Sequence, residues 1–249
     1  MNFAEGRDDK IAELNRILSR GGAVLFTGAG FSVPSGIPDF RSQGGIYDTS
    51  AGGRSAEYML SHECLVEHPD EFFEFYKTKM IYPNAKPNAA HVKFAELEKA
   101  GFVDAVVTQN IDGLHQAAGS RKVWELHGSV ERNYCASCGK RYDLKYVLEC
   151  NGVPKCSRCG GTVRPEVVLY GECLDERTLA GAIDAVQKAR TLIVAGTSLS
   201  VYPAAGLVDL FEGENLVLIN KTPTPKDGLA TLAIYGDVAE VAKRIEVSK

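Results

Sequence analysis

AVLFTGAGFS, residues 23–32, joins a short apolar run to a glycine-rich loop. Ala23–Phe26 has the composition of a buried strand, and glycines that follow a strand let the backbone approach a pyrophosphate. The loop is not G-x-G-x-x-G, and the sequence contains no G-x-x-x-x-G-K-S/T, so neither a plain dehydrogenase fingerprint nor a triphosphate-binding loop is present. The glycines therefore indicate either a nucleotide site or a tight turn between a strand and a helix.

Further short apolar runs, rich in β-branched residues, are typical of a parallel sheet buried on both faces. They span residues 104–107, 123–126, 192–195 and 216–219. The spacing of apolar residues predicts helices over Asp8–Ser19, over Glu57–Met80 with a break at Pro69, and over Asn88–Lys99. Thr27–Gly53 is rich in Gly, Ser and Pro, and a loop of that length is usually functional or mobile. The pattern predicts an α/β fold.

Polar or small residues follow four of these predicted strands. They are Thr108–His115, Leu126-His127-Gly128, Gly196-Thr197-Ser198 and Asn220-Lys221. Open parallel sheets bind ligands beyond the carboxyl ends of their strands, so we expect these residues to share one site. His127 is a candidate general base there, because an unperturbed histidine has a pKa of about 6.5. A hydrogen-bonded core histidine is the alternative interpretation.

Two C-x-x-C pairs, Cys135/Cys138 and Cys156/Cys159, fit the spacing of a structural zinc site. Four thiolates leave no open position for water, so the zinc would be structural rather than catalytic. It would supply the folding free energy that Glu131–Arg164, poor in aliphatic residues, lacks. Two disulfides or a redox pair are the alternative, and a reducing compartment disfavours them. Cys64, Cys150 and Cys173 follow no such pattern and stay unassigned.

Composition and charge exclude several classes of protein. The chain has 249 residues, of which 45% are hydrophobic and 24% charged, so it is not wholly disordered. Its net charge of −4 argues against a global electrostatic grip on nucleic acid, and we expect no specific nucleic-acid binding. No apolar run approaches the length of a membrane span, and the first twenty residues lack the pattern of a signal peptide. We therefore expect no membrane partner and a cytoplasmic location.

Taken together, these motifs resemble the sirtuins, the NAD-dependent protein deacylases, in a bacterial or archaeal form without terminal extensions. Besides the glycine-rich loop and the four cysteines, the resemblance rests on SGIPDFR (35–41), TQNIDGLH (108–115), LHG (126–128), RPEVVLYGE (164–172), GTSLSVYPA (196–204) and GDV (236–238). The motifs follow in order over nearly the whole chain.

The resemblance implies two domains. Residues 1–43, 83–130 and 164–249 would form a Rossmann-like parallel sheet with helices on both faces. A helical insertion, residues 44–82, and a zinc-binding module, residues 131–163, would together form a small domain. NAD and an acyl-lysine protein or peptide would meet in the cleft between the domains.

The resemblance also implies which residues form the site. The NAD pyrophosphate would face Gly28, Ala29, Gly30 and Ser32, with Phe40 and Arg41 in a flexible loop that guards the ribose and nicotinamide. Gln109, Asn110, Ile111 and Asp112 would line the ribose and nicotinamide pocket, and Asn110 and Asp112 would join His127 in catalysis. The adenosine half would be held by Gly196, Thr197, Ser198, Asn220, Lys221, Asp237 and Val238. The substrate peptide would add as a strand to Val168, Leu169, Tyr170, Gly171 and Glu172.

In the implied reaction, the acyl oxygen attacks C1′ of the nicotinamide ribose and nicotinamide leaves, in a site shielded from water. His127 then acts as general base on a ribose hydroxyl, which attacks the imidate carbon. Water finally releases lysine and O-acyl-ADP-ribose. A mono-ADP-ribosyltransferase with the same cleft and a non-catalytic NAD- or zinc-binding scaffold are the alternatives. The presence of His127, Asn110 and Asp112 disfavours the scaffold.

Some positions depart from the commoner sirtuin pattern. Val33-Pro34 predicts a stiffer loop, Tyr170 adds a hydroxyl where Phe is usual, and Asn220-Lys221-Thr222 lacks the acidic residue often found two after the Asn. Tyr76-x-x-Lys79 has lysine where sirtuins that remove succinyl groups have arginine, and lysine lacks the bidentate fork. We interpret Lys79 as part of a solvated helix face. We expect deacetylation, with other short acyl groups as further substrates.

Overall fold

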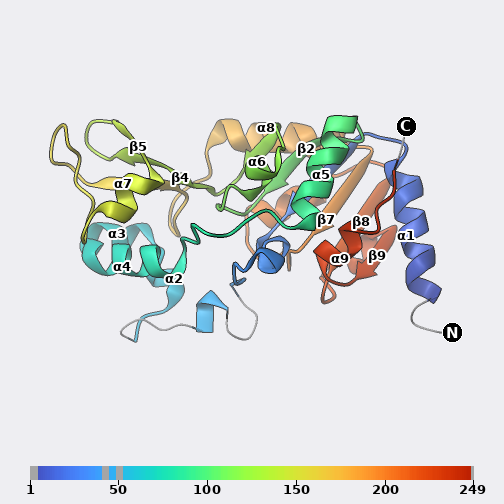
Figure 1. Ribbon diagram of the computed structural model, residues 1–249, viewed down its shortest axis with the longest axis horizontal. Coiled ribbons are helices and arrows are strands. Elements are labelled where there is room, and N and C mark those ends of the chain that lie inside the picture. Colours follow the sequence, from blue (N-terminus) through green and yellow to red (C-terminus); the bar gives the residue numbers. More distant parts are fainter. Residues whose placement is uncertain (1–4, 41–44, 49–52, 248–249) are drawn as a thin grey trace.

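Six parallel strands form the larger of two sheets. A computed structural model of the chain describes residues 5–40, 45–48 and 53–247. The order is β3–β2–β1–β7–β8–β9, and every pairing in it is parallel (Figure 1). The strands are β1 (Ala23–Thr27), β2 (Val103–Thr108), β3 (Val123–Glu125), β7 (Thr191–Ala195), β8 (Asn215–Asn220) and β9 (Leu232–Tyr235). The five strands expected from apolar runs are all present, and β9 is an edge strand that the sequence did not predict.

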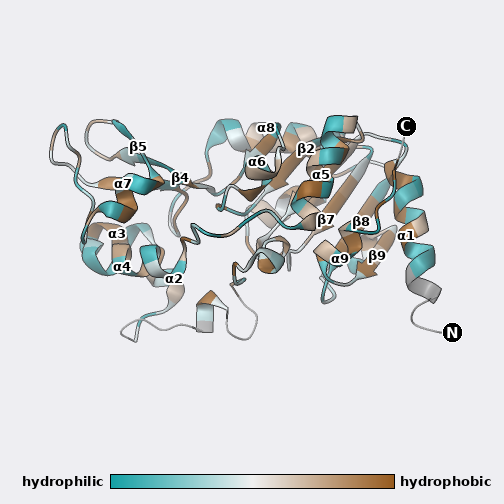
Figure 2. Cartoon of the chain, in the orientation of Figure 1, coloured by the Kyte–Doolittle hydropathy of each residue, from teal (hydrophilic) through white to brown (hydrophobic). Residues whose placement is uncertain are grey.

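Helices cover both faces of this sheet because alternate side chains of each buried strand point to opposite faces. On β1, Leu25 packs into a core with α1 (Glu5–Leu18), α5 (Ala89–Ala100) and α9 (Val238–Ala242). Its neighbour Phe26 packs on the other face with α8 (Glu176–Lys188) and the 3₁₀ helix η4 (Ala204–Leu210). Figure 2 accordingly shows the strands as hydrophobic and the outer helix surfaces as largely hydrophilic. The predicted α/β class, with a Rossmann-like sheet covered on both faces, is confirmed.

Helix boundaries follow the capping residues. Asn88 caps α5, its side chain accepting hydrogen bonds from Ala90 N and His91 N, and Gly101 ends the helix in a left-handed conformation with φ of +82°. Residues 57–80 break twice rather than once, because Ser61 caps a new helix in addition to the break at Pro69. The result is three helices: α2 (Ala56–Met59), α3 (His62–Glu67) and α4 (Pro69–Lys79).

A second, antiparallel sheet carries the cysteines. Its order is β5–β4–β6, with β4 (Gly128–Cys135), β5 (Arg141–Asp143) and β6 (Val163–Val167), and α7 (Leu144–Glu149) lies beside it. Val130, Val147 and Val163 from this segment share one buried core with Phe72 and Tyr76 of α4. The cysteine-rich segment was expected to lack an apolar core of its own, and it obtains one from the neighbouring helices. We call this group, residues 53–81 and 128–167, the zinc lobe, and the six-stranded sheet with its helices the sheet lobe.

The two lobes lie at opposite ends of the long axis of the molecule, and β4 leads from one toward the other (Figure 1). The long loop after β1 forms short 3₁₀ turns, η1 (Ala29–Phe31), η2 (Val33–Ser35) and η3 (Ile46–Asp48). Within the described residues, no helix is both long enough and apolar enough to cross a membrane.

Candidate active site

A cleft of about 1010 Å³ lies between the carboxyl ends of the sheet-lobe strands and the zinc lobe. Nearly all of the expected site residues line it. They are Gly28, Ala29, Gly30, Ser32, Phe40, Gln109, Asn110, Ile111, Asp112, His127, Val168, Leu169, Tyr170, Gly171, Glu172, Gly196, Thr197, Ser198, Asn220, Lys221 and Val238. Asp237 does not line the cleft, and Arg41 falls outside the described residues. The cleft thus receives loops from both lobes.

The glycine-rich loop packs directly on the loop that follows β7. A Cβ atom at Gly30 would lie 2.9 Å from Gly196 O, and one at Gly28 would lie 2.7 Å from the Thr197 Cβ atom. Gly196 has φ of +64°, and a side chain there would collide with the backbone nitrogen of Phe31. The glycines are therefore required for the contact between two loops, and that contact leaves both backbones at the surface of the cleft.

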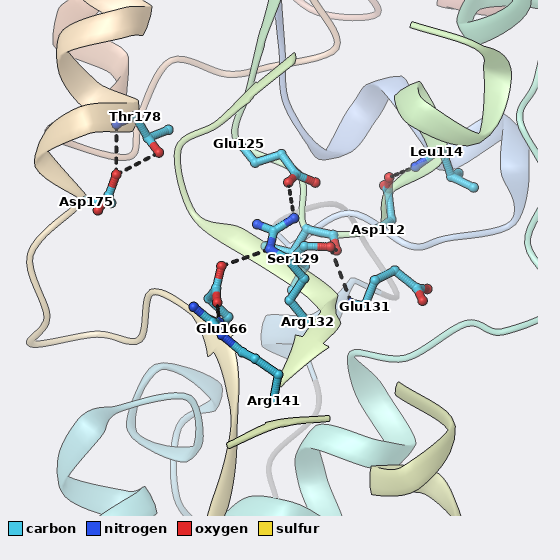
Figure 3. Close-up of polar contacts among 11 residues, drawn as sticks. Asp112, Leu114, Glu125, Ser129, Glu131, Arg132, Arg141, Glu166, Asp175 and Thr178 are labelled. Atoms are coloured by element: carbon cyan, nitrogen blue, oxygen red, sulfur yellow. Dashed lines mark hydrogen bonds and ion pairs between the residues drawn. The ribbon is translucent and has the colours of Figure 1, made fainter. Parts of the chain in front are cut away.

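Ser32, Asn110 and Asp112 form a hydrogen-bonded trio on the cleft wall. Asn110 Nδ2 donates to Ser32 Oγ at 3.0 Å, and Ser32 Oγ donates to Asp112 Oδ2 at 2.7 Å. Leu114 N donates to Asp112 Oδ1 at 2.9 Å (Figure 3). Burial raises the pKa of Asp112, and the hydrogen bonds from Leu114 and Ser32 offset part of this rise. The trio offers fixed polar groups that suit the hydroxyls of a sugar.

The buried hydroxyls of Thr27 and Thr108 support this trio from below. Thr108 was expected at the site, and sequence analysis assigned no role to Thr27. Thr108 Oγ1 accepts from Asn110 N at 3.0 Å and from Thr27 Oγ1 at 2.8 Å. Thr27 Oγ1 lies 3.0 Å from His115 Nε2, and burial lowers the pKa of His115 well below its usual value. His115, at the start of α6 (Leu114–Ala118), is thus a neutral group that holds the end of β1 in place.

His127 follows β3 and faces the cleft, with its ring oriented by the backbone. Its Nδ1 lies 2.9 Å from Gln109 O, and a carbonyl oxygen only accepts, so Nδ1 carries the proton. Nε2 is therefore the nitrogen with the free lone pair. Burial lowers the pKa of His127, while the bond to Gln109 raises it in part, so the ring is neutral and basic near pH 7.

Ion pairs join the two sheets close to His127. Arg132 of β4 donates to Glu125 of β3 at 2.6 Å and to Glu166 of β6 at 2.8 Å (Figure 3). Glu166 also pairs with Arg141 of β5. Gly128, with φ of +75°, leaves no room for a side chain against the Glu166 carbonyl. These contacts fix the backbone on both sides of His127.

At the other end of the cleft, Thr197 receives two amide side chains. Gln109 Nε2 donates to Thr197 Oγ1 at 3.2 Å, and Asn220 Nδ2 donates to Thr197 O at 3.3 Å. Lys221 pairs with Asp237 at 3.1 Å. Asp237 also caps α9 by accepting from Ala239 N at 2.9 Å, so its carboxylate orders the wall behind the cleft.

Residues 168–172 bridge the two lobes along the cleft. Val168 N donates to His127 O at 3.0 Å, and Tyr170 N donates to Leu60 O at 3.0 Å. The Tyr170 hydroxyl, expected beside the acyl-lysine, meets the hydroxyl of Tyr47. Lys79 of α4 borders the cleft and is half-buried, so its helix face is less solvated than expected.

The four cysteines have the geometry of a zinc site. Their sulfur atoms all lie within 4.8 Å of one another, with Cys135–Cys159 at 3.5 Å and Cys138–Cys156 at 3.6 Å. A tetrahedron with zinc–sulfur bonds of about 2.3 Å places sulfurs about 3.8 Å apart, whereas a disulfide needs about 2.05 Å. All seven cysteines are free thiols. The donor set therefore fits zinc, and the disulfide alternative is wrong.

The chain is similar to known proteins in both sequence and structure. The model of the Sir2 family matches residues 28–203. An NAD-dependent protein deacetylase of Clostridium perfringens is 54% identical over 241 residues, which cover 96% of this chain and 99% of that protein. A solved structure of Sir2 with a p53 peptide and NAD+ superposes with a TM-score of 0.84 at 43% identity, covering 94% and 96% of the two chains. A Sir2 structure with a propionylated peptide has a TM-score of 0.84 at 43% identity, covering 95% and 97%.

Proposed function

The chain belongs to the Sir2 family, and we propose that its cleft removes acyl groups from protein lysines while it consumes NAD. Nicotinamide and O-acyl-ADP-ribose are the other products, and acetyl is the preferred acyl group. The observation that carries this proposal is the free Nε2 of His127 in a cleft that a glycine-rich loop and an extended segment both line. The relatives support it, since a deacetylase is 54% identical to this chain.

The sheet-lobe loops would hold NAD, and their shape suits it. Gly28, Ala29, Gly30 and Ser32 would face the pyrophosphate, because their backbone is packed tightly against Gly196 and leaves its outer side to the cleft. Gly196, Thr197, Ser198, Asn220, Lys221 and Val238 would line the adenosine half, with Asp237 acting through Lys221. Phe40 would cover the nicotinamide ribose, and the proposed role of Arg41 beside it stays a prediction.

Bound NAD supplies the ribose carbon that accepts the acyl oxygen as nicotinamide departs. Asn110 and Asp112, tied together through Ser32, would orient the ribose, and Gln109 and Ile111 would complete the pocket. His127 would take the proton of a ribose hydroxyl on Nε2, while Nδ1 stays hydrogen-bonded to Gln109 O. The apolar residues around this wall would exclude water.

The acyl-lysine peptide would lie between the lobes along Val168, Leu169, Tyr170, Gly171 and Glu172, and it would add as a strand where the peptide groups of this segment are unbonded. Zinc on Cys135, Cys138, Cys156 and Cys159 would stabilise the zinc lobe and take no part in the chemistry. We also propose the domain division given by the resemblance, with residues 44–82 and 131–163 inserted into the NAD-binding domain. Four reduced thiolates support a cytoplasmic location.

The direct test incubates the protein with an acetyl-lysine peptide and NAD and follows all products by mass spectrometry. We expect deacetylated peptide, nicotinamide and O-acetyl-ADP-ribose in equal amounts, and no product without NAD. ADP-ribosylated peptide with the acetyl group retained would instead identify a mono-ADP-ribosyltransferase. Binding of NAD with no turnover on any acyl-peptide would identify a scaffold.

A further inference from the structure

The backbone of residues 167–172 presents peptide groups along two edges, and those along one edge are hydrogen-bonded to the rest of the protein. Successive residues of an extended segment direct their peptide groups to opposite edges. Val168 N donates to His127 O at 3.0 Å, Tyr170 N donates to Leu60 O at 3.0 Å, and Tyr170 O accepts from His62 N at 2.9 Å. This inner edge therefore offers little to an added strand.

Side chains close the outer edge over its first part. Val167 O accepts from Arg164 Nη2 at 3.1 Å, and Leu169 N donates to Glu172 Oε2 at 2.9 Å. Leu169 O accepts from Glu172 N at 3.0 Å. The groups of Val167 and Leu169 that a peptide strand would use are thus already bonded within the protein.

Arg164 and Glu172 hold each other in position. Arg164 Nη1 lies 2.5 Å from Glu172 Oε1 and Nη2 lies 2.9 Å from Oε2, a bidentate pair with side-chain exposures of 11% and 19%. His62 Nδ1 lies 2.8 Å from Glu172 Oε1. Burial raises the pKa of Glu172, but hydrogen bonds from Arg164, Leu169 N and His62 outweigh it and hold the pKa at about 2. Glu172 is therefore a carboxylate at any pH at which the enzyme would work.

Gly171 differs from the residues before it. Among the described residues, no hydrogen-bond partner meets its N–H or its C=O. It lines the cleft with φ of +88° and has open space where a side chain would be. Its peptide groups are the first on this segment that a substrate backbone can reach.

We propose that Arg164 and Glu172 are positioning residues that close residues 167–169 to strand addition and so direct the substrate peptide to pair from Gly171 onward. The inference rests on the proposed function, because it assigns a register to the peptide of that reaction. Register matters here because a slip of one residue turns every side chain to the opposite face. A slipped peptide would point its acyl-lysine away from His127.

The test is a scan with acetyl-lysine peptides that each carry one N-methylated backbone amide. Wild-type protein should lose about tenfold in kcat/KM at one or two amides and little elsewhere, because one register is used. In Glu172→Ala the freed Leu169 N–H admits other registers, so the loss at those amides should fall below about threefold. The KM for the unmethylated peptide should rise about tenfold with a small change in kcat.

Two further variants separate positioning from general damage. Glu71→Gln is the matched control: Glu71 pairs with Arg54 at 2.7 Å in the zinc lobe but bonds no group of residues 167–172, so the wild-type pattern should persist. Glu172→Gln keeps an oxygen for Leu169 N–H but loses the paired charge, and should broaden the pattern less than Glu172→Ala does. It also replaces that variant if Glu172→Ala does not retain zinc.

A wild-type methylation pattern in the folded Glu172 variants would overturn the inference. That outcome would leave the proposed function intact, because the wild-type protein would still deacetylate the peptides. A wild-type protein that deacetylates none of the peptides with NAD would instead overturn the proposed function itself.

Discussion

The sheet lobe and the zinc lobe reach stability by different routes. In the sheet lobe, strands such as β1 and β7 are buried along their whole length, with apolar cores on both faces. In the zinc lobe, the strands are only partly buried, and one apolar core is shared with α2, α3 and α4. Burial of apolar surface suffices for the first lobe, while the second needs its four thiolates and a metal in addition.

The difference carries over to the site. The sheet lobe places the polar trio of Ser32, Asn110 and Asp112 and the ring of His127 on rigid strand ends. The zinc lobe contributes contacts to the extended segment, through Leu60 and His62, and apolar surface around the cleft. In the proposed reaction, the sheet lobe would therefore hold the reacting groups, and the zinc lobe would shape the place where a peptide lies.

Loss of zinc should have the largest effect, because it should unfold the zinc lobe and leave the sheet lobe folded. Cys135→Ala removes one ligand, and we expect the zinc lobe to lose more than about 5 kcal/mol and unfold, because metal binding supplies its folding free energy. The single tryptophan, Trp124 on β3, packs against Gly181 of α8, so its fluorescence reports on the sheet lobe alone and should stay native. Zinc content measures the loss of the metal, limited proteolysis measures unfolding of the zinc lobe, and tryptophan fluorescence measures whether the sheet lobe stays folded.

Cys64→Ala is the control for this experiment. Cys64 is buried in the same core but is not a zinc ligand, so its loss should cost about 1 kcal/mol and leave the metal bound. If Cys135→Ala lost zinc and yet resisted proteolysis as the wild type does, the zinc lobe would not depend on its metal.

The next largest effect should come from the sheet lobe, where a substitution disturbs the packing between the loops that follow β1 and β7. Gly196→Ala places a side chain against Phe31 N at φ of +64°, and we expect a cost of about 3 kcal/mol together with at least tenfold weaker NAD binding. Gly36→Ala is matched, because its φ is +86° but nothing lies near the added carbon, so it should cost only about 1 kcal/mol. Denaturant unfolding and calorimetry measure both. Equal costs would mean that the contact between the two loops is unimportant.

The smallest expected effect is a shift in the midpoint of the pH dependence of kcat/KM. In the proposed reaction the neutral form of His127 is the active base, so kcat/KM should fall as pH decreases through its pKa and stay level above it. Because burial lowers that pKa, the midpoint should lie below about 6.5. His68→Gln, which removes a half-exposed histidine of the zinc lobe, should leave the midpoint in place. A midpoint at or above 6.5 would contradict the buried, hydrogen-bonded ring.

What could be predicted from sequence follows the same division. Strands buried on both faces are continuous apolar runs, so β1, β2, β3, β7 and β8 were found, and their polar ends indicated the cleft. In contrast, β4, β5 and β6 were missed, because charged side chains such as Arg132 and Glu166 interrupt their short apolar pattern. Cysteine spacing alone predicted the zinc site, since four ligands in two fixed pairs need no knowledge of the strands between them.

Contacts that depend on register could not be predicted. Thr27 meets Thr108 because β1 and β2 pair at those residues, and no local pattern shows that pairing. The bond between Arg164 and Glu172 likewise needs the turn at Gly171, which brings the two side chains together. Asp237 was expected to face the adenosine half, which stays a prediction, and no local pattern shows that it also caps α9 and pairs with Lys221.

The most direct test of the account compares wild-type protein with His127→Ala on an acetyl-lysine peptide and NAD. Nicotinamide departs before His127 acts in the proposed reaction, so exchange of labelled nicotinamide into NAD should persist in the variant. Deacetylation should fall by at least about a thousandfold, with zinc content and unfolding temperature unchanged. Deacetylation at the wild-type rate in this variant would contradict the assignment of His127 as the general base, and with it the central claim about the cleft.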